Sequence, residues 1–196
     1  MGTSPMPEAA EPGRRLPRAR RRQQIIDAAT RAFARSGFAA TSLDDIAAEA
    51  GVSRAILYRH FESKTDLYQA VLDSACTRLA AATGADEFTD ASIDGLVRVA
   101  AEDPAAFRLL FQHAAREPEF RQAMDRFRAD MTRLAHKHLS HAIPDPGWAD
   151  WAAALVPTVA VSAVIAWLDA GQPDPEQAAE RIRRAIGGVI AAARDA

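Results

Sequence analysis

The segment from Leu43 to His60 has residue types and spacings suited to reading a DNA major groove. Two short helices that cross at a sharp turn need a small residue at the crossing, a glycine with positive φ in the turn, and apolar residues that hold the pair together. Ala47 is the small residue, and Gly51 follows four positions later. The apolar positions are filled by Ile46, Val52 and Leu57. This pattern predicts a helix-turn-helix.

The remaining face of the second helix of this motif is free to enter a groove. That face is made of Ser53, Arg54, Ala55, Tyr58 and Arg59. Arg54 is the best candidate for reading a base, because its guanidinium can bridge the O6 and N7 atoms of guanine. The alternative is that Arg54 is an ordinary solvated surface arginine.

The run from Thr41 to Leu67, TSLDDIAAEAGVSRAILYRHFESKTDL, closely resembles the DNA-binding domain of the TetR family of transcriptional regulators. Gly-Val-Ser, Leu-Tyr-x-His-Phe and a lysine three residues after Phe61 fall in one unbroken register. The resemblance extends from the first helix to the start of the fourth. The rest of the chain is similar only as an all-helical region of suitable length, so the resemblance indicates little about a ligand.

The resemblance implies further DNA contacts. Thr41 and Ser42, at a helix N-terminus, would offer hydroxyls and backbone N–H groups to a phosphate. Tyr58 and His60 would contact the DNA backbone, and Lys64 would clamp a phosphate. His60 has the alternative of a packed histidine at a helix end.

One position departs from the common family pattern. Ile56 stands where threonine is frequent. Isoleucine cannot hydrogen-bond to DNA, so this contact is either lost or becomes an apolar contact with a thymine methyl group.

Basic residues concentrate near the N-terminus. Six of the nine residues 14–22 are arginine, and residues 1–64 carry 11 basic and 7 acidic side chains against 13 and 19 in the remainder. A basic front and an acidic rear suit a protein that meets a polyanion at one end. The arm could lie in a minor groove, with Arg21 and Arg22 as the contacts nearest the folded helix. A solvated tail is the alternative.

Hydrophobic periodicity predicts an all-α fold, with an N-terminal three-helix helix-turn-helix DNA-binding domain and a C-terminal helical ligand-binding and dimerisation domain. The front helices are expected over about 18–35, from a cap at Thr41, from Ser53 to about His60, and from Ser63 to about Thr83. The predicted divisions are a disordered arm over 1–17, the DNA-binding domain over 18–64, a connecting helix and linker over 65–91, and the rear domain over 92–196.

Rear helices are predicted near 93–102, from Asp103-Pro104, over 118–142, over 151–168 and from Asp174-Pro175 onward. The stretch 151–168 is uncharged and long enough for a membrane span. Its alanine content, Pro157 and flanking aspartates favour a helix buried within or between subunits. Gly187-Gly188 in the last helix predicts a close approach by another helix, and these last two helices are the expected dimer contact.

Aromatic and histidine side chains of the rear domain predict a ligand pocket, although plain core is the alternative for each. The pocket candidates are Phe107, Phe111, His113, Phe127, Met131, His138, Trp151 and Trp167. His136, His138 and His141 do not predict a metal site, because His136 and His138 point to different helix faces. No metal and no cofactor are expected.

Several classes are excluded by composition and motif. A single cysteine, Cys76, rules out a disulfide scaffold and a cysteine-rich metal site, and its apolar neighbours predict a small buried residue, with a redox sensor as the alternative. No phosphate loop, Gly-x-Ser-x-Gly or His-Glu-x-x-His motif supports an enzyme. The N-terminus lacks the apolar region of a secretory signal, which predicts a cytoplasmic protein without a membrane partner.

Together these patterns predict a homodimeric, ligand-responsive transcriptional regulator, in particular a repressor. It would bind double-stranded DNA at a palindromic operator and be released by an unknown small-molecule effector. The main alternative is an architectural or protein-tethering DNA-binding factor whose rear domain binds a protein. An all-helical enzyme is the third possibility.

Overall fold

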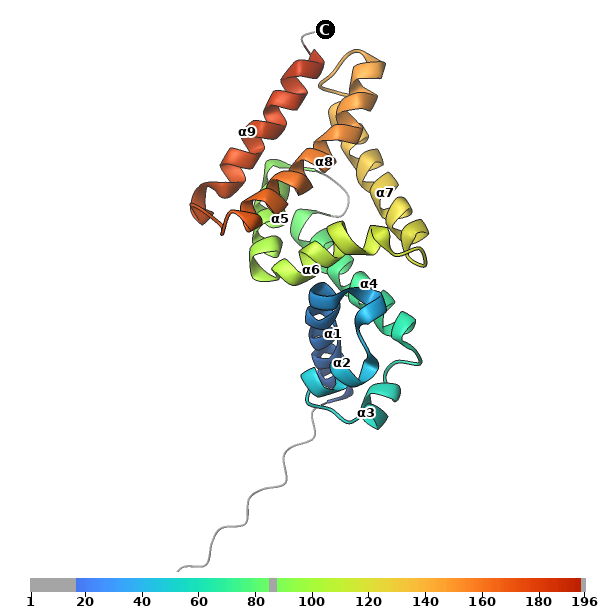
Figure 1. Cartoon of the computed structure of the whole chain (residues 1–196). Coiled ribbons are helices and arrows are strands. Elements are labelled where there is room, and N and C mark those ends of the chain that lie inside the picture. The colour runs from blue at the N-terminus through green and yellow to red at the C-terminus, as the bar shows by residue number, and fades with distance from the viewer. Residues whose placement is uncertain (1–16, 85–87, 195–196) are drawn as a thin grey trace, which may run out of the picture.

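The computed structural model describes residues 17–84 and 88–194, and these residues form helices and their connections without a strand. The helices form a small front unit and a larger rear unit, joined by a helix that belongs to both (Figure 1). The predicted all-α class is confirmed. Of the predicted arm over residues 1–17, residues 1–16 lie outside the described residues, and Pro17 is the N-cap of α1.

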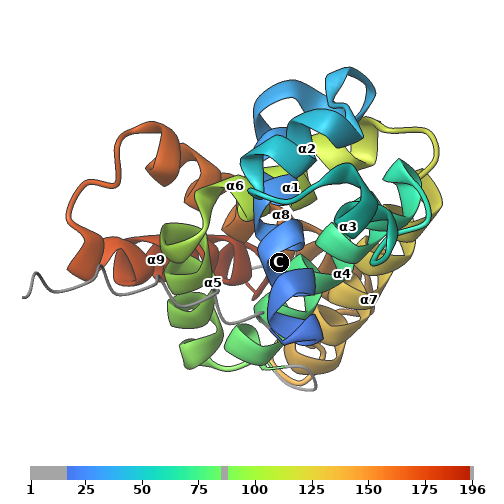
Figure 2. The same ribbon diagram turned by 90° about the horizontal axis from the view of Figure 1, so that it is seen from below.

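The front unit contains α1 (Arg18–Ala40), α2 (Leu43–Glu49) and α3 (Arg54–Tyr58), and α4 (Lys64–Thr83) leads from it into the rear unit. The apolar stripe of α1 includes Ile25 and Phe33, which are fully buried together with Ile46 of α2 and Leu57 of α3. Residues at helical spacing on three short helices therefore share one core. Seen from below, α1, α2 and α3 lie in front of the rear helices (Figure 2).

The boundary between α1 and α2 corrects one expectation. Gly37 has a φ of 78° and ends the regular helix as predicted, but one more turn follows before Thr41. The N-cap of α2 is Ser42 and not Thr41. Ser42 Oγ accepts a hydrogen bond from the backbone N–H of Asp45 (3.1 Å), and the Asp45 carboxylate accepts one from the N–H of Ser42 (3.1 Å). This reciprocal capping box fixes the start of α2.

The rear unit contains α5 (Asp90–Glu102), α6 (Pro104–Arg108), α7 (Arg121–Leu139), α8 (Pro146–Asp169) and α9 (Pro175–Arg194). Between α6 and α7 the chain forms a π-helical segment, η1 (Leu109–His113), and a 3₁₀ turn, η2 (Ala114–Arg116). The long helices α7, α8 and α9 pack side by side, and α5 lies against α4, α8 and α9 (Figure 1).

Two rear helices have limits that differ from the predicted ones. α7 begins at Arg121 rather than Pro118, because Glu117 to Phe120 form a turn. α8 begins at Pro146, since Asp145 caps it by accepting a hydrogen bond from the N–H of Trp148 (2.9 Å). The π-helical turn of η1 was not predicted; its i→i+5 bonding has no simple composition signature.

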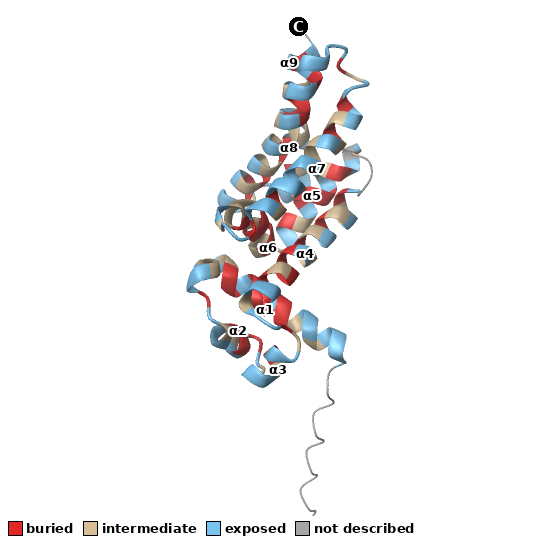
Figure 3. Cartoon of the chain, turned by 90° about the vertical axis from the view of Figure 1, so that its right-hand side faces the viewer, coloured by how far each residue is buried: buried red, intermediate tan, exposed pale blue. Residues whose placement is uncertain are grey.

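α8 is long and apolar enough to cross a membrane by length and composition alone. It packs on α7 and α9, yet only 28% of its most apolar window is buried within the protomer. Trp148 and Trp151 near its start are each 40% exposed, and their rings meet edge to face. The outer sides of α8 and α9 carry long exposed stretches (Figure 3). The apolar surface of α8 is therefore covered only in part by its own chain.

The glycines of the rear unit show where helices approach closely. A Cβ at Gly95 of α5 would lie 1.9 Å from the carbonyl oxygen of Ala82, so α5 packs directly on the backbone of α4. A Cβ at Gly187 or Gly188 would meet nothing within 4 Å. The close approach predicted at Gly187-Gly188 is thus absent within the described protomer, because α9 leaves that side open.

An aromatic cluster joins the two units. Phe33 and Phe38 of α1 contact Tyr68 of α4, with ring centroids 4.8 and 5.0 Å apart. Phe120, at the start of α7, contacts Tyr68 (4.5 Å) and Phe38 (5.5 Å). The α1 helix also packs on α6 and η1. A shift of the rear helices therefore reaches α1 and α4 through packed side chains.

The hydroxyl of Tyr68 is buried in this cluster and has no hydrogen-bond partner among the described residues. Burial, with the nearby Glu117 carboxylate adding to it, raises the pKa of Tyr68 well above its usual value. Because a buried polar group without a partner is destabilising, Tyr68→Phe should raise the free energy of unfolding by about 1 kcal/mol. Urea denaturation measures this change.

The exposed Tyr58 provides the matched control for this prediction. Tyr58→Phe removes an exposed hydroxyl with a long hydrogen bond from Arg54 (3.4 Å), and it should leave the unfolding free energy within about 0.5 kcal/mol of the original. A Tyr68→Phe variant less stable than the parent would show that the hydroxyl has a bonding partner, such as an ordered water.

Candidate nucleic-acid interface

The turn between α2 and α3 has the geometry predicted from the sequence. Gly51 has a φ of 62°, which favours glycine. The N–H of Gly51 donates to the carbonyl of Ala48 (3.1 Å), and the N–H of Val52 donates to that of Ala47 (2.9 Å). Ala47 is buried where α2 meets its neighbours. The described turn is therefore held by backbone bonds, and it sets the angle at which α3 leaves α2.

The start of α1 braces this turn from behind. The side-chain amide of Gln24 donates to the carbonyl of Ala50 (2.7 Å), and Arg21 in turn donates to the amide oxygen of Gln24 (3.0 Å). The guanidinium of Arg22 lies over the ring of Phe61, 5.0 Å from its centroid. Arg21 and Arg22 thus belong to the folded helix α1, beside the helix-turn-helix, rather than to an extended arm.

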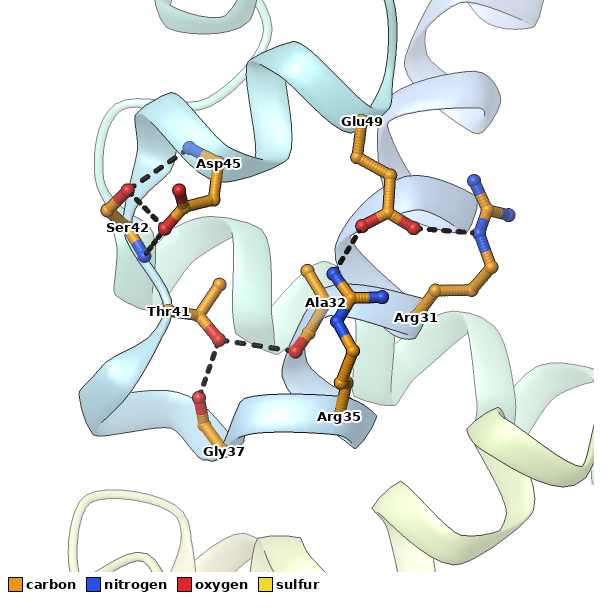
Figure 4. A network of polar contacts seen from close by, with 8 residues as sticks. All are labelled: Arg31, Ala32, Arg35, Gly37, Thr41, Ser42, Asp45 and Glu49. Carbon is orange, nitrogen blue, oxygen red and sulfur yellow. Dashed lines mark hydrogen bonds and ion pairs between the residues drawn. The ribbon is translucent and has the colours of Figure 1, made fainter.

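A polar network holds α2 against α1 (Figure 4). Arg31 and Arg35 of α1 both bond the carboxylate of Glu49, at 2.9 and 2.7 Å. These bonds, Arg35 first, lower the pKa of Glu49, while bonds from Ser42 lower the pKa of Asp45. Both carboxylates therefore stay ionised at neutral pH. Glu49 holds α2 against α1, and Asp45 holds the first turn of α2.

The outward face of α3 carries the side chains predicted to meet DNA. Ser53, Arg54, Ala55 and Tyr58 are all exposed, while Leu57 on the opposite side is buried. Ser53 is also the N-cap, and its hydroxyl accepts a hydrogen bond from the N–H of Ile56 (3.3 Å). A side chain that caps the helix in this way holds its first turn in shape while remaining at the surface.

Arg54 is paired on the protein surface with a residue that the sequence did not single out. Its guanidinium bonds the carboxylate of Asp44 (3.1 Å) and the hydroxyl of Tyr58 (3.4 Å), and it lies over the Tyr58 ring. The bond to Tyr58 and the charge of Asp44 raise the pKa of Arg54. Since both side chains of the ion pair are more than half exposed, the pair is weak and easily exchanged for another acceptor.

His60 lies at the end of α3 among four arginines. Burial, followed by the charges of neighbouring arginines, lowers the pKa of His60. These arginines are Arg18, Arg59, Arg22 and Arg21, in decreasing order of effect. The start of α1 and the end of α3 therefore form one positive surface beside the exposed side chain of Arg54. Among the predicted contacts, His60 is half-buried and Arg22 is exposed.

This arrangement predicts a pH dependence of stability. Because the pKa of His60 is lower in the folded protein than in the unfolded chain, the folded state prefers the neutral ring. The stabilisation is complete above about pH 6.5, the unfolded value, and is lost as the pH falls through the folded pKa. The unfolding free energy should thus fall more between pH 7 and 5.5 for the parent than for His60→Gln, measured by urea denaturation. Parallel pH profiles would contradict this.

The side chains of Thr41 and Lys64, which were predicted to contact phosphates, bond backbone carbonyl groups of the protein. The hydroxyl of Thr41 is buried and donates to the carbonyl of Gly37 (2.7 Å). The ammonium of Lys64 bonds the carbonyl oxygens of Phe38 (2.9 Å) and Thr41 (3.1 Å), with Ala39 completing the set at 3.3 Å. Both side chains turn inward and bond the carboxyl end of α1, whereas their contacts with phosphate stay a prediction. Ser42 is exposed at the start of α2, as expected.

Lys64 therefore has a structural role that can be measured. Lys64→Ala removes all three donors from the end of α1 and the contact of the ammonium with the Phe38 ring (4.5 Å). We expect a loss of about 2 kcal/mol in the free energy of unfolding. Lys137→Ala, at an exposed position of α7, is the matched control and should change it by less than about 0.5 kcal/mol. Equal stability of the two variants in urea would refute the role.

Two cavities lie among the rear helices. The first, about 270 Å³, is enclosed by α5, α7, α8 and α9, and the second, about 380 Å³, by η1, α7 and α8. Of the predicted ligand residues, Phe111 and Met131 line both cavities, His138 lines the first and Phe127 the second.

The remaining predicted ligand residues lie outside these two cavities. Phe107 is buried in the core beside a small void. Trp167 packs at the end of α8, where its indole N–H donates to the carbonyl of Pro173 (2.9 Å). Trp151 is on the outer surface, and His113 ends the π-helical segment. Helical spacing identified the aromatic stripe, but it did not distinguish which side of each helix faces a cavity.

Cys76 is half-buried on α4 and packs against the core, as its neighbours predicted. Burial, with Asp73 adding to it, raises the pKa of the Cys76 thiol to about 11. The thiol is therefore protonated at neutral pH and a poor nucleophile. Within the described ranges no three histidine, cysteine or acidic side chains are placed to hold a metal ion.

The exposed recognition helix, the backbone-bonded turn and the adjacent arginines define a helix-turn-helix protein of the DNA-binding type. Residues 25–71 match the family model described as bacterial regulatory proteins, tetR family. The match covers the helix-turn-helix and the first part of α4, so this part of the chain is similar to the DNA-binding domain of the TetR family.

Two relatives show how far the sequence similarity extends. The transcriptional activator FasR of Mycolicibacterium smegmatis is 37% identical over 109 residues, which cover 52% of this chain and 50% of FasR. The regulator TtgR of Pseudomonas putida is 57% identical over 53 residues, 27% of this chain and 25% of TtgR. The matches thus span half or less of these relatives.

A solved structure extends the likeness to the rear unit. The TetR-like regulator from Rhodococcus sp. RHA1 superimposes with a TM-score of 0.79 at 23% identity, covering 90% of this chain and 99% of that one. This likeness concerns the fold of both units.

Proposed function

We propose that this protein is a transcriptional repressor that binds a palindromic DNA operator as a homodimer in the cytoplasm and is released by a small molecule. The observation that carries the proposal is the exposed face of α3, where Arg54 stands beside the positive surface around His60. A guanidinium whose contacts with Asp44 and Tyr58 are all exposed can exchange Asp44 for the edge of a guanine. The surrounding arginines would fix the register through phosphates.

The dimer is supported by α8 and α9. One recognition helix reads only a few base pairs, so a specific site calls for two copies on a two-fold axis. The partly covered apolar surface of α8, the exposed Trp148 and Trp151, and the open side of α9 at Gly187 and Gly188 leave an apolar surface that a second copy would cover. We place the dimer contact there, which also assigns the apolar α8 to a protein interface and not to a membrane.

Release by a small molecule is supported by the cavities and by the junction between the units. A molecule in the rear cavities contacts η1 and α7, and the aromatic cluster of Phe38, Tyr68 and Phe120 connects those elements to α1 and α4. If it binds one arrangement of the rear helices better, it shifts the separation of the two recognition helices. A separation away from about 34–36 Å prevents both from seating in successive major grooves.

Fluorescence anisotropy with the purified protein tests the proposal. The intergenic DNA upstream of its own gene and a scrambled duplex are titrated at two salt concentrations. Preferential binding to the native duplex, weakened steeply by salt, is the expected result. A reporter under that promoter should become more active when the protein is deleted. A fall in reporter activity would make the protein an activator, and equal weak binding to both duplexes would reject this region as its operator.

A further inference from the structure

The two rear cavities are adjacent and share part of their walls. Phe111, Met131, Pro157 and Val161 line both, so these four side chains form the partition between them. Each cavity alone is near the lower bound of about 300 Å³ for pockets that hold drug-sized molecules, and the two together lie well within the usual range. The size of a ligand that fits therefore depends on whether the partition opens.

The partition is made of side chains that can move. Methionine has three rotatable bonds and no branch, so Met131 adapts to a neighbouring molecule at small cost. Phe111 lies on η1, the π-helical segment, a rare geometry that is frequent at functional sites. Its ring is flanked by those of Phe107 (4.7 Å) and Phe127 (6.0 Å), which offer apolar surfaces on either side.

The polar groups around the first cavity are engaged with the protein. Ser92 donates to the carbonyl of Thr83 (2.5 Å), and Thr83 donates to that of Leu79 (3.0 Å). Arg183 bonds Asp94 and Glu180, so its charge is compensated. Among the described lining residues of both cavities there is no carboxylate. A cation buried there would gain no counterion. An anion would find only Arg183 and Arg128, and both are already paired, Arg128 with Asp125 (3.3 Å), so the body of a ligand has to be uncharged and apolar.

The first cavity has a polar residue where it meets solvent. His138 lines that cavity and is exposed, and Gly187 lines it from the opposite helix α9, where a Cβ would meet nothing within 4 Å. The ring nitrogens of His138 can donate or accept a hydrogen bond. A ligand can thus keep a polar end hydrated beside His138 while its body points inward to the partition.

From these observations we propose that the two cavities form one site for an elongated, uncharged aliphatic molecule. Its polar end lies beside His138 and its tail passes between Phe111 and Met131 into the second cavity. This inference rests on the proposed ligand-responsive function and names the chemical class of the effector.

Isothermal titration calorimetry of the full chain with primary n-alkanols, from hexanol to tetradecanol, tests the site. Affinity should rise about fourfold for each added methylene and continue to rise past the length that fills the first cavity. An α,ω-dicarboxylate of the longest bound length should bind more than a hundredfold more weakly, because its far charge would be buried. A rise that stops at short chains, or equal affinity of the dicarboxylate, overturns the proposal.

Two variants, each filling one cavity, distinguish the contributions of the two cavities to alkanol binding. Ala135→Leu fills the first cavity and should weaken every alkanol, whereas Thr132→Phe fills the second and should reduce long alkanols to the affinity of short ones. His138→Leu should cost about two- to tenfold at every length. Arg126→Phe, at an exposed position of α7, is the control for added bulk and should change no affinity. Unchanged long-chain binding by a folded Thr132→Phe variant excludes the second cavity.

Operator binding and alkanol binding, measured on the same protein, distinguish a failure of this inference from a failure of the proposed function. Operator binding that is specific and insensitive to every alkanol, with no heat of alkanol binding, overturns the ligand class and leaves a DNA-binding regulator. Alkanol binding with the expected length dependence, without any effect on operator binding, upholds the site and overturns release by that ligand.

Discussion

Arg54→Ala should abolish most of the preference of the dimer for its operator over a scrambled duplex. A bidentate arginine contact to guanine contributes about 1–3 kcal/mol of discrimination, and two half-sites double it to about 2–6 kcal/mol. Binding to the scrambled duplex should fall much less, because that binding rests on phosphates. Anisotropy titrations of both duplexes at one salt concentration measure the ratio.

Arg59→Ala is the matched control for this prediction. Arg59 is exposed next to Tyr58 and belongs to the positive surface around His60, so its removal should weaken both duplexes to a similar extent and reduce the salt dependence. If Arg54→Ala also weakened both duplexes equally, Arg54 would be a backbone contact and another residue would read the bases.

Gly95→Ala should be the most destabilising conservative substitution in the rear unit. The added Cβ would lie 1.9 Å from the carbonyl oxygen and 2.6 Å from the carbonyl carbon of Ala82. Both atoms are backbone, so α4 and α5 have to separate. We expect a loss of about 3 kcal/mol in the free energy of unfolding. Because α4 leads into the helix-turn-helix, operator affinity should fall as well.

Gly187→Ala distinguishes this clash from a general intolerance of alanine. Within one protomer the Cβ there meets nothing within 4 Å, so at protein concentrations low enough to separate the subunits this replacement of a helical glycine by alanine should stabilise α9 by about 0.5–1 kcal/mol. Urea denaturation of the two variants side by side gives the comparison. Similar stabilities would show that α5 does not pack on α4 as closely as described.

Most of the fold could be predicted because local signals agreed with one another. Asp103-Pro104 and Asp174-Pro175 each mark a helix start, and α6 and α9 begin at those prolines. The glycine and the apolar positions of the helix-turn-helix gave its turn and its core. The sequence also contains the signal for an N-cap at Ser42, since Asp45 follows three residues later and completes a capping box. Thr41 offers the same spacing, with Asp44 three residues later, so the sequence alone does not separate the two candidate caps.

The errors at the site concern contacts between distant segments. Lys64 has the sequence position of an exposed cation, but the carbonyl groups that it bonds belong to the end of α1, more than twenty residues away. The pairing of Arg54 with Asp44 likewise depends on the angle between α2 and α3. In the rear unit, periodicity marked Phe111 and Trp151 alike as apolar positions, whereas tertiary packing places one at a cavity and the other at the surface.

The three tryptophans of the chain all lie on α8, at its exposed start and its buried end. Tryptophan emission consequently reports on the rear unit alone, because the DNA-binding unit contains no tryptophan. In a separated protomer Trp148 and Trp151 emit from a wet environment and Trp167 from a dry one. Covering the first two by a second copy shifts their emission to shorter wavelength, so subunit association can be followed without a label and without interference from bound operator.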